Sequence, residues 1–583
     1  MMQPQEPLST APPAAHQGSW VDWYGQRWST VDRRAWTRRT MGVLWIVYVM
    51  LLLWYTSGAL PFGPNQGDAV QEASGVEHIV RYGWDAPLLT HNFVGCPGVT
   101  TTLVLIRRAT GIEPLSILSA LCMLAGVVFN LSAAGLGRRL TGLATPLCGI
   151  VVLLSPIAIS IGMYANDLIM AAACATSALF LFAGRLHWLN CAAGAVLLGF
   201  AGWYRADAIL ITPAIPFLLY RGNWRAMLRW IVVIGLGAAL VALALVYGSG
   251  SNLHAILAHA EAVADHPGRA ARILGFYVSF FPLIMVYLLA LGIIRLIRQR
   301  CGLLICLCIA GIVPLWSVML TYPLPKYHTY VVPFFAVVCL VGLGAVLSAA
   351  PSRRRRVHLT LITLLFVGQY VIGARIALRD KPWWDELRPT PVTLYEKKLP
   401  RGRIDDFSLV IGPGTFNPFG HAGTPISGLL FTPLVYQEEK RVARKFMDEY
   451  IAYVAALQDP ELRFFGMTHR SVQWSVYALV HAGFRCLENK PFGPKNHWRL
   501  IWKRDGQHVV QYRLAGDTYD MTYLRSLGEL SGIYPMGSGR EESVILEQAT
   551  SADLIARTSN LGTYAAYRVT FPPLEKPAPT PAP

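Results

Sequence analysis

Charged residues beside apolar segments are the positions at which this chain could do chemistry. Asp68 stands a short stretch beyond the first apolar segment, Asp167 opens a later one, and Arg205 and Asp207 lie together between two others. Lys326 is the only lysine among the first 380 residues, where arginine fills every other basic position. A carboxylate can activate or orient a nucleophile, and a lysine is a compact charge suited to a phosphate. These residue types therefore predict a site in which carboxylates and cations work together.

The elements that must position these side chains are long apolar segments. The chain has 583 residues, of which 54% are hydrophobic and only 15% are charged. A soluble protein carries about 25% charged residues, so this composition excludes a disordered protein, a disulfide scaffold and an ordinary cytosolic enzyme. Most segments approach the roughly 20 residues that cross a bilayer. We therefore predict a polytopic α-helical membrane protein with about eleven spans, at 43–60, 115–137, 143–163, 166–184, 188–204, 207–220, 230–248, 275–294, 303–321, 329–348 and 357–374.

The distribution of charge predicts the topology. Residues 1–377 hold 12 of the 34 acidic residues and 26 of the 51 Lys and Arg, whereas residues 378–583 are nearly balanced. With the amino terminus in the cytoplasm, alternating spans place 18 Lys and Arg on the inner side and 8 on the outer side, as the positive-inside rule requires. The carboxy-terminal part then lies outside. Because the positive charge forms short clusters between apolar segments, it marks topology and does not indicate a nucleic-acid partner.

The same patterns predict the domain organisation. We expect a basic, largely disordered cytoplasmic segment over 1–42, a membrane domain over 43–377, an extracytoplasmic α/β domain over 378–576 and a Pro-rich tail over 577–583. In the α/β domain the patterns predict two helices, at 437–457 and 469–483, and five strands, at 409–411, 497–503, 508–513, 543–547 and 565–571.

The first outer loop contains an apolar segment, 99–113, that carries Arg107 and Arg108. Burying two guanidinium groups in lipid would cost roughly 3 kcal/mol each. We therefore predict an interfacial helix here, not a further span.

The order of the charged motifs resembles that of the C-type glycosyltransferases, multispan enzymes that take sugars from polyprenyl-phosphate carriers. Gly67-Asp68, Tyr82-Gly83-Trp84 and His91-Asn92-Phe93 are similar to the acidic first outer loop of that family. Asn166-Asp167 is similar to its second acidic position, Tyr204-Arg205-Ala206-Asp207 to its Arg-acid pair, and Lys326-Tyr327-His328 to its basic-Tyr motif. The resemblance covers about 40–345, and the layout is nearest to the bacterial branch of mannosyl- and aminoarabinose-transferase-like enzymes. Ala69 replaces the second acid of the protein mannosyltransferases, which leaves the acceptor type open.

The resemblance implies an inverting transfer of a sugar from a polyprenyl-phosphate-linked donor to a lipid, polysaccharide or protein acceptor. It implies a multi-pass protein of the inner (plasma) membrane, with the reaction at the outer face. Asp68 and Asp167 would be catalytic, and the substrate-binding residues would be Lys326, Arg205, Asp207, His91, His328 and Tyr327. Lys326 and Arg205 would hold the leaving phosphate, so we expect neither a metal nor a cofactor. The expected partners are the donor, the acceptor and membrane lipid.

Other interpretations of the same residues stay open. A transporter or lipid flippase would place ionisable groups in the middle of spans, whereas nearly every charge here lies at an outer edge. A non-catalytic scaffold of cell-envelope glycan assembly would not need a reactive Asp68. Arg205 and Asp207 alone could be a salt bridge between two helices, and Lys326 an interfacial lysine that reaches toward lipid headgroups.

Overall fold

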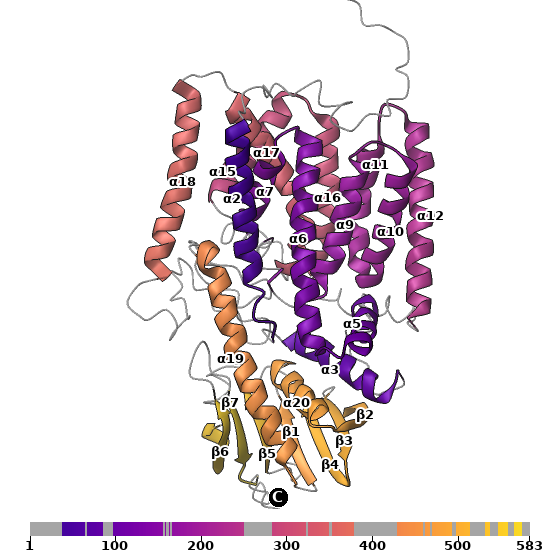
Figure 1. The fold of residues 1–583 in the computed structure, drawn as a ribbon, viewed down its shortest axis with the longest axis vertical. Helices are drawn as coiled ribbons and strands as arrows, with labels where there is room; N and C mark the ends of the chain where they lie inside the picture. The colour runs from indigo at the N-terminus through magenta and orange to yellow at the C-terminus, as the bar shows by residue number, and fades with distance from the viewer. Residues whose placement is uncertain are drawn as a thin grey trace, which may run out of the picture.

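The described part of the chain forms a helical bundle, two outer helices below it, and a sheet with two helices of its own (Figure 1). A computed structural model of the chain describes residues 38–63, 67–84, 97–155, 158, 162–163, 166–249, 283–321, 325–348, 353–377, 428–458, 461–466, 469–492, 497–513, 531–536, 546–557 and 565–573.

Every apolar segment singled out in the sequence contains helix. The segment 207–220, which carries two prolines, folds as the 3-10 helix η3 followed by a short α-helix. The bounds are α2 (Arg38–Ser57), α6 (Pro114–Thr141), α7 (Thr145–Leu153), α9 (Leu168–Phe182), α10 (Trp188–Tyr204), η3 (Ala206–Ala214), α11 (Ile215–Leu219), α12 (Trp224–Gly248), α15 (Leu283–Arg298), α16 (Gly302–Thr321), α17 (Val332–Ser348) and α18 (Arg353–Ala377).

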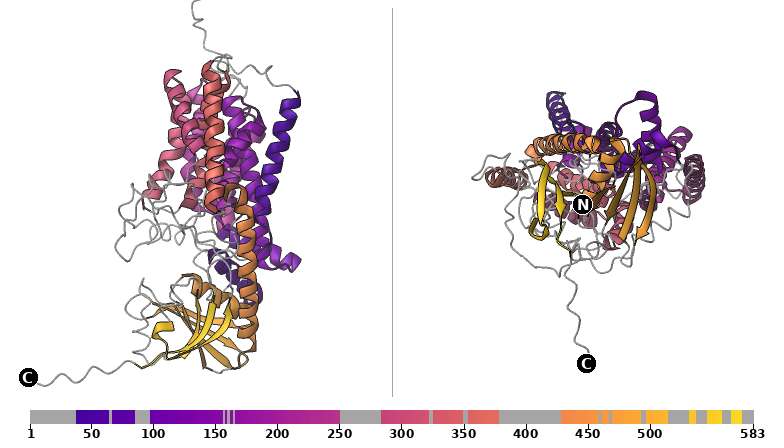
Figure 2. Two further views of the ribbon diagram at one scale, coloured as in Figure 1. Left: turned by 90° about the vertical axis from the view of Figure 1, so that its left-hand side faces the viewer. Right: turned by 90° about the horizontal axis from the view of Figure 1, so that it is seen from below.

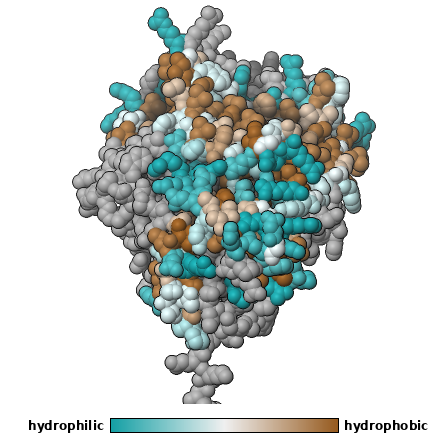
Figure 3. All heavy atoms as spheres, turned by 60° about the horizontal axis from the view of Figure 1, so that its bottom comes forward, coloured by the Kyte–Doolittle hydropathy of each residue, from teal (hydrophilic) through white to brown (hydrophobic). Residues whose placement is uncertain are grey.

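Among the described residues, three helices are long and apolar enough to cross a membrane by length and composition: α2, α6 and α12. Four shorter apolar helices accompany them. The surface agrees with a bilayer setting: α12 exposes Leu236, Leu240 and other large apolar side chains along its length. In Figure 3 apolar side chains gather mostly over the bundle, and hydrophilic ones over the outer helices and the carboxy-terminal domain. The count of eleven spans and the in–out orientation stay predictions.

Local sequence signals explain where the bundle helices begin and end. In α6, Pro114 occupies the first turn, where a missing N–H costs nothing, and Gly142 ends the helix in the left-handed conformation (φ 73°). The Gly142 N–H donates to Arg138 O at 2.8 Å. In α12, the Asn223 side chain accepts from the first free backbone N–H groups of the helix.

The helix α9 lies at the centre of the bundle, packed against α6 and α10. It is rich in alanine and almost entirely buried, with Ala171, Ala172 and Ala175 inaccessible to solvent. Lipid is as apolar as the surface of a membrane helix, so membrane helices associate through close packing, and small side chains such as alanine allow that packing. A central, tightly packed α9 fixes the position of Asp167, which immediately precedes it.

Two helices lie between the bundle and the sheet (Figure 1): α3 (Gly67–Tyr82) and α5 (Pro97–Thr110). The segment predicted as an interfacial helix is therefore helical. Arg107, in the last turn of α5, forms an ion pair with α3, because its Nε lies 2.9 Å from Glu77 Oε2. This ion pair joins the two outer helices.

In the described residues of the carboxy-terminal part, seven strands form one mixed sheet, in the order β2-β3-β4-β1-β5-β7-β6. The strand β1 pairs in parallel with β4 and β5, and the other pairs are antiparallel, with Trp502 of β3 opposite Val509 of β4. The bounds are α19 (Gly428–Ala456), β1 (Glu461–Gly466), α20 (His469–His481), β2 (Arg485–Phe492), β3 (His497–Arg504), β4 (Gln507–Arg513), β5 (Ser531–Met536), β6 (Ser551–Arg557) and β7 (Ala565–Thr570).

The sequence predictions for this domain are partly right. Both predicted helices and the strands at 497–503, 508–513 and 565–571 correspond to α19, α20, β3, β4 and β7. Of the strand predicted at 543–547, residues 543–545 lie outside the described residues, and the prediction is wrong at 546–547, which belong to a helical turn over 546–548; a strand follows as β6. The sequence does not predict β6, because this edge strand exposes the apolar Leu554 and so lacks a clear alternation of apolar and polar residues. The predicted strand 409–411 lies outside the described residues.

The helix α19 connects the sheet to the bundle, and both views show it running from one to the other (Figures 1 and 2). Its Lys440 is fully buried, and Nζ donates to the carbonyls of Gly58 at 3.0 Å and Ala59 at 2.7 Å, just after α2. Gln437 adds a bond to Ser57 O at 2.8 Å. The carboxy-terminal domain is therefore held at the end of the first bundle helix.

Candidate functional site

Arg205 is the centre of a polar cluster at the end of the bundle. It follows α10 with extended backbone (φ −158°, ψ 126°), and Asp207 stands in the first turn of η3. The Nε group lies 3.1 Å from both Asp207 oxygens, and Nη2 lies 3.0 Å from Oδ2. A guanidinium that meets a carboxylate through two nitrogens is held in a fixed plane, so Asp207 orients Arg205.

The second carboxylate of the cluster comes from α9. Arg205 Nη1 forms an ion pair with Asp167 Oδ2. Just before it, the buried Asn166 accepts from Leu168 N at 2.8 Å and so begins the helix. The backbone of Asn166 is fixed in turn by Cys122 Sγ of α6, 3.3 Å from its nitrogen. The fold therefore brings together Asp167, Arg205 and Asp207, as the sequence predicted for the last two.

Two tyrosines from the 3-10 helix η4 (Pro325–Tyr330) complete the cluster. Tyr327 OH lies 3.3 Å from Arg205 Nη2, and its ring centroid is 5.5 Å from the guanidinium carbon. Tyr330 OH donates to Asp207 Oδ1 at 3.0 Å. A 3-10 helix has three residues per turn, so positions three apart share one face. Tyr330 was missed in the sequence, although its spacing from Tyr327 was a usable signal.

Two carboxylates of the cluster contact the same guanidinium. The side chains of Arg205, Asp167 and Asp207 are 15%, 18% and 17% exposed, so these ion pairs form in a largely desolvated place. Nearly all N–H groups of Arg205 are engaged by Asp167, Asp207 and Tyr327. Arg205 is therefore better placed to hold the carboxylates than to bind a phosphate directly.

A chain of contacts joins this cluster to the outer helix that carries Asp68. Asp68 is the second residue of α3, and Glu72, one turn later, accepts a hydrogen bond from Thr100 of α5. Thr102 Oγ1 lies 3.5 Å from Tyr204 OH, next to Arg205. Gly98 allows this approach, because a Cβ atom there would lie 2.9 Å from Trp203 O and 2.8 Å from the Trp203 ring.

The remaining predicted site residues differ in what the structure describes. Lys326 is the second residue of η4, directly before Tyr327, and His328 is buried in the same helix. The side chains of Asp68 and Lys326 and the whole of His91 lie outside the described part of the chain. Their roles stay predictions.

The described residues contain no group of three or more His, Cys, Asp or Glu that could hold a metal ion. The chemistry available at the cluster is that of oriented carboxylates, a guanidinium and two phenolic hydroxyls. These groups can position a hydroxyl nucleophile or bind a polar head group at this end of the bundle.

Comparison with known proteins finds solved structures with a similar fold. No family model and no curated protein matches the sequence. The crystal structure of ArnT from Cupriavidus metallidurans bound to undecaprenyl phosphate superposes with a TM-score of 0.55 at 12% identity, covering 90% of this chain and 97% of that one. The apo form of ArnT gives 0.55 at 13% identity, with 91% and 98% covered. The archaeal oligosaccharyltransferase AglB from Archaeoglobus fulgidus gives 0.43 at 11% identity, with 74% and 63% covered.

The predicted resemblance to the C-type glycosyltransferases is thus confirmed at the level of fold. The ArnT match extends over nine tenths of the chain and therefore continues beyond the bundle into the carboxy-terminal part.

Proposed function

We propose that the chain is an integral membrane glycosyltransferase that moves a sugar from a polyprenyl-phosphate-linked donor to an acceptor at the outer face of the inner membrane. The observation that carries this proposal is the Arg205 cluster, with its two carboxylates and two tyrosines, at the outer end of a bundle with the fold of ArnT. The crystal structure of that protein holds undecaprenyl phosphate.

In this mechanism Asp68 is the base that activates or orients the acceptor hydroxyl for attack at the anomeric carbon. Its place at the start of α3, beside the outer end of the bundle, supports that role (Figure 1). Attack from the face opposite the phosphate gives net inversion. The bond from the anomeric carbon to the phosphate oxygen breaks, and the polyprenyl phosphate leaves as an anion.

The leaving phosphate requires a cation, and we assign Lys326 to it. The residue adjoins Tyr327, whose hydroxyl contacts Arg205, so η4 ties the lysine to the cluster. The carboxylates of Asp167 and Asp207 lie in the same cluster and favour a cation beside them. Arg205 is then a positioning residue that keeps both carboxylates in place, with Tyr327 and Tyr330 supporting it. Tyr327, His91 and His328 are further candidates for contact with the donor.

Binding of undecaprenyl phosphate to the purified protein in nanodiscs tests the donor class. We expect wild type and Asp68→Asn to bind alike, and Lys326→Ala to bind at least tenfold more weakly. Lys445→Ala is the matched control, because Lys445 is 69% exposed on α19. A folded wild type that does not bind the lipid, or equal binding by Lys326→Ala, refutes the assignment.

A further inference from the structure

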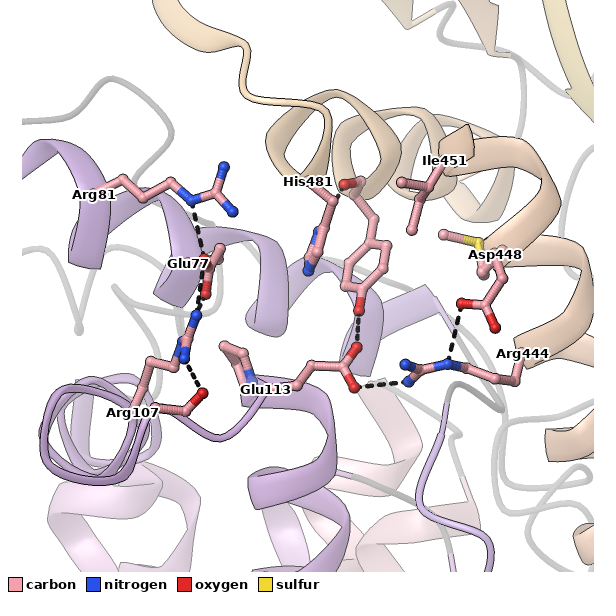
Figure 4. Close-up of a pocket in the computed structure, with 12 residues that line it drawn as sticks. Glu77, Arg81, Arg107, Glu113, Arg444, Asp448, Ile451 and His481 are labelled. Atoms are coloured by element: carbon pink, nitrogen blue, oxygen red, sulfur yellow. Dashed lines mark hydrogen bonds and ion pairs between the residues drawn. The ribbon is translucent and has the colours of Figure 1, made fainter. Parts of the chain in front are cut away.

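A polar cavity lies where the carboxy-terminal domain meets the outer helices, and we call it the interdomain cavity. Its volume is about 320 Å³, at the small end of the range for pockets that hold small ligands. Figure 4 shows side chains from α3, α5, α19 and α20 converging on it. Its lining consists of Glu77, Arg81, Arg107, Gly111, Glu113, Pro114, Arg444, Met447, Asp448, Ile451, Tyr477 and His481.

Two groups of ion pairs face each other across this cavity (Figure 4). On one side Glu77, only 3% exposed, pairs with Arg81 at 2.9 Å and with Arg107 at 2.9 Å. On the other side Glu113 pairs with Arg444 at 2.7 Å, and Arg444 Nε lies 3.2 Å from Asp448. Three guanidiniums and three carboxylates cancel, so the cavity has no formal net charge.

Each side also keeps hydrogen-bonding capacity that the protein does not use. Within the described part of the chain, the Nη2 groups of Arg81 and Arg444 have no hydrogen-bond partner, since Arg81 uses Nε and Nη1, and Arg444 uses Nε and Nη1. Asp448 is 59% exposed and has open acceptor sites. The cavity lining thus contains both hydrogen-bond donors and acceptors that a ligand could use.

His481 supplies a neutral acceptor between the two groups. Its Nδ1 lies 2.9 Å from the carbonyl oxygen of Tyr477, which can only accept, so Nδ1 carries the proton and Nε2 is an acceptor. Burial lowers the pKa of His481 below its ordinary value of 6.5, so the ring is neutral at pH 7. The Tyr477 and His481 rings lie against each other, with centroids 3.9 Å apart, and with Met447 and Ile451 they add apolar surface to the cavity.

These features restrict the class of ligand. A purely apolar ligand would leave guanidinium and carboxylate groups desolvated without partners. A phosphate or carboxylate would meet Glu77, Glu113 and Asp448 with no excess of positive charge to offset them. A sugar ring carries hydroxyls that both donate and accept and has C–H faces that pack on apolar surface, and it is neutral. A neutral sugar therefore matches the hydrogen-bonding groups, the apolar surface and the zero formal net charge of the cavity.

The interdomain cavity is lined in part by α3, the helix that also carries the candidate base Asp68. Glu77 is nine residues after Asp68 in α3 and Arg81 thirteen, which corresponds to about 13 Å and about 20 Å along the helix axis. An extended acceptor bound at both places would present its reacting hydroxyl at one end of α3 and a more distant unit at the other.

We propose that the interdomain cavity binds a neutral saccharide unit of the acceptor, so that the acceptor is a glycan or a glycan-bearing molecule. This proposal rests on the proposed glycosyltransferase function, and it assigns the carboxy-terminal domain a part in acceptor selection through Arg444, Tyr477 and His481.

An array of printed oligosaccharides, neutral and anionic, probed with labelled protein in nanodiscs tests this proposal. The affinity of the best-retained glycan is then measured for wild type, Ile451→Trp, which fills the cavity, and His481→Ala, which removes the neutral acceptor. Ala452→Trp is the matched control, because it adds the same ring at an exposed neighbouring position of α19. Thermal unfolding of each variant verifies that it is folded.

We expect wild type to retain neutral glycans, at least tenfold weaker binding by Ile451→Trp and His481→Ala, and unchanged binding by Ala452→Trp. Retention of anionic glycans alone, no retention by wild type, or equal affinity of all variants overturns the proposal. Undecaprenyl phosphate binding is measured on the same preparations. If the lipid binds and no glycan does, the saccharide site fails while the transferase function stands; if the glycan alone binds, the donor assignment fails.

Discussion

Replacing Arg205 by alanine tests the physical account of the cluster. The substitution removes the guanidinium that both Asp167 and Asp207 contact, and each carboxylate is less than a fifth exposed. Removing one partner of a buried ion pair costs about 3–5 kcal/mol, because the remaining charge stays desolvated. Asp207 keeps the bond from Tyr330, so we expect the lower end, about 3 kcal/mol of unfolding free energy.

A double-mutant cycle separates this interaction from lost packing. Asp207→Ala leaves Arg205 paired with Asp167, so it should cost less, about 1.5–2 kcal/mol, at the low end for hydrogen bonds to a charged group. Arg205→Ala/Asp207→Ala also removes one of the two carboxylates that the guanidinium stabilises, and its cost should fall short of the sum of the single effects by about 1.5–3 kcal/mol. Arg205→Lys should keep the charge but lose the two-nitrogen geometry and lie between wild type and Arg205→Ala.

Titration with a denaturing detergent, which unfolds the five proteins reversibly in mixed micelles, measures these free energies. Additive single effects, with a coupling below about 0.5 kcal/mol, would refute the reasoning, because residues that share one ion-pair network must interact. Equal stability of wild type and Arg205→Ala would also contradict it.

Three further predictions concern the outer helices. Glu113→Gln should weaken the docking of α19 and α20 by about 1.5–3 kcal/mol, because Glu113 binds Arg444 and Tyr477; faster hydrogen exchange in α20 checks it, with the exposed Glu449→Gln as control. Burial raises the pKa of Glu113, but its bonds from Tyr477 and Arg444 outweigh burial and hold the pKa below the ordinary 4.5. The carboxylate's contribution to docking is therefore present above pH 4.5 and is lost as the pH falls through the lowered pKa of Glu113. Protonation of His481, whose pKa is also lowered, already opposes docking below pH 6.5. An increase in docking stability as the pH falls from 6.5 to 3 would contradict both expectations. Gly98→Ala should cost about 1–3 kcal/mol because its Cβ would strike Trp203, whereas Gly202→Ala, with nothing within 4 Å, should be neutral or stabilising in thermal unfolding; equal effects would contradict the close approach of α5 and α10.

Hydropathy predicted the bundle because lipid imposes one requirement, a long apolar helix, on every span. The segment 207–220 shows the limit of that signal: it is apolar, but Pro213 falls within η3, so the structure there is a 3-10 helix. In the carboxy-terminal domain β2 contains charged residues and a proline, and β6 is an exposed edge strand, so neither alternates clearly.

The contacts of the candidate site were also only partly predictable from the sequence. Arg205 and Asp207 are two residues apart, and the short spacing predicted their pairing. The pairing of Arg205 with Asp167, 38 residues earlier, and of Asp207 with Tyr330, 123 residues later, depends on how α9 and η4 pack, which no local pattern encodes. The ion pair of Glu77 with Arg81 was predictable from its i, i+4 spacing on a helix, whereas Glu113 meets Arg444 across domains.

Sugar transfer from a polyprenyl-phosphate donor is the central claim, and lipid analysis of living cells tests it most directly, because the readout has the same form whichever sugar is transferred. Lipids are extracted from cells that lack the native gene and carry wild type, Asp68→Asn or Lys445→Ala, and polyprenyl-phosphate sugars are quantified by mass spectrometry. We predict that one such lipid accumulates with Asp68→Asn and is consumed with wild type and Lys445→Ala. Identical polyprenyl-phosphate-sugar profiles for wild type and Asp68→Asn would contradict the assignment of Asp68 as the base of a glycosyltransferase.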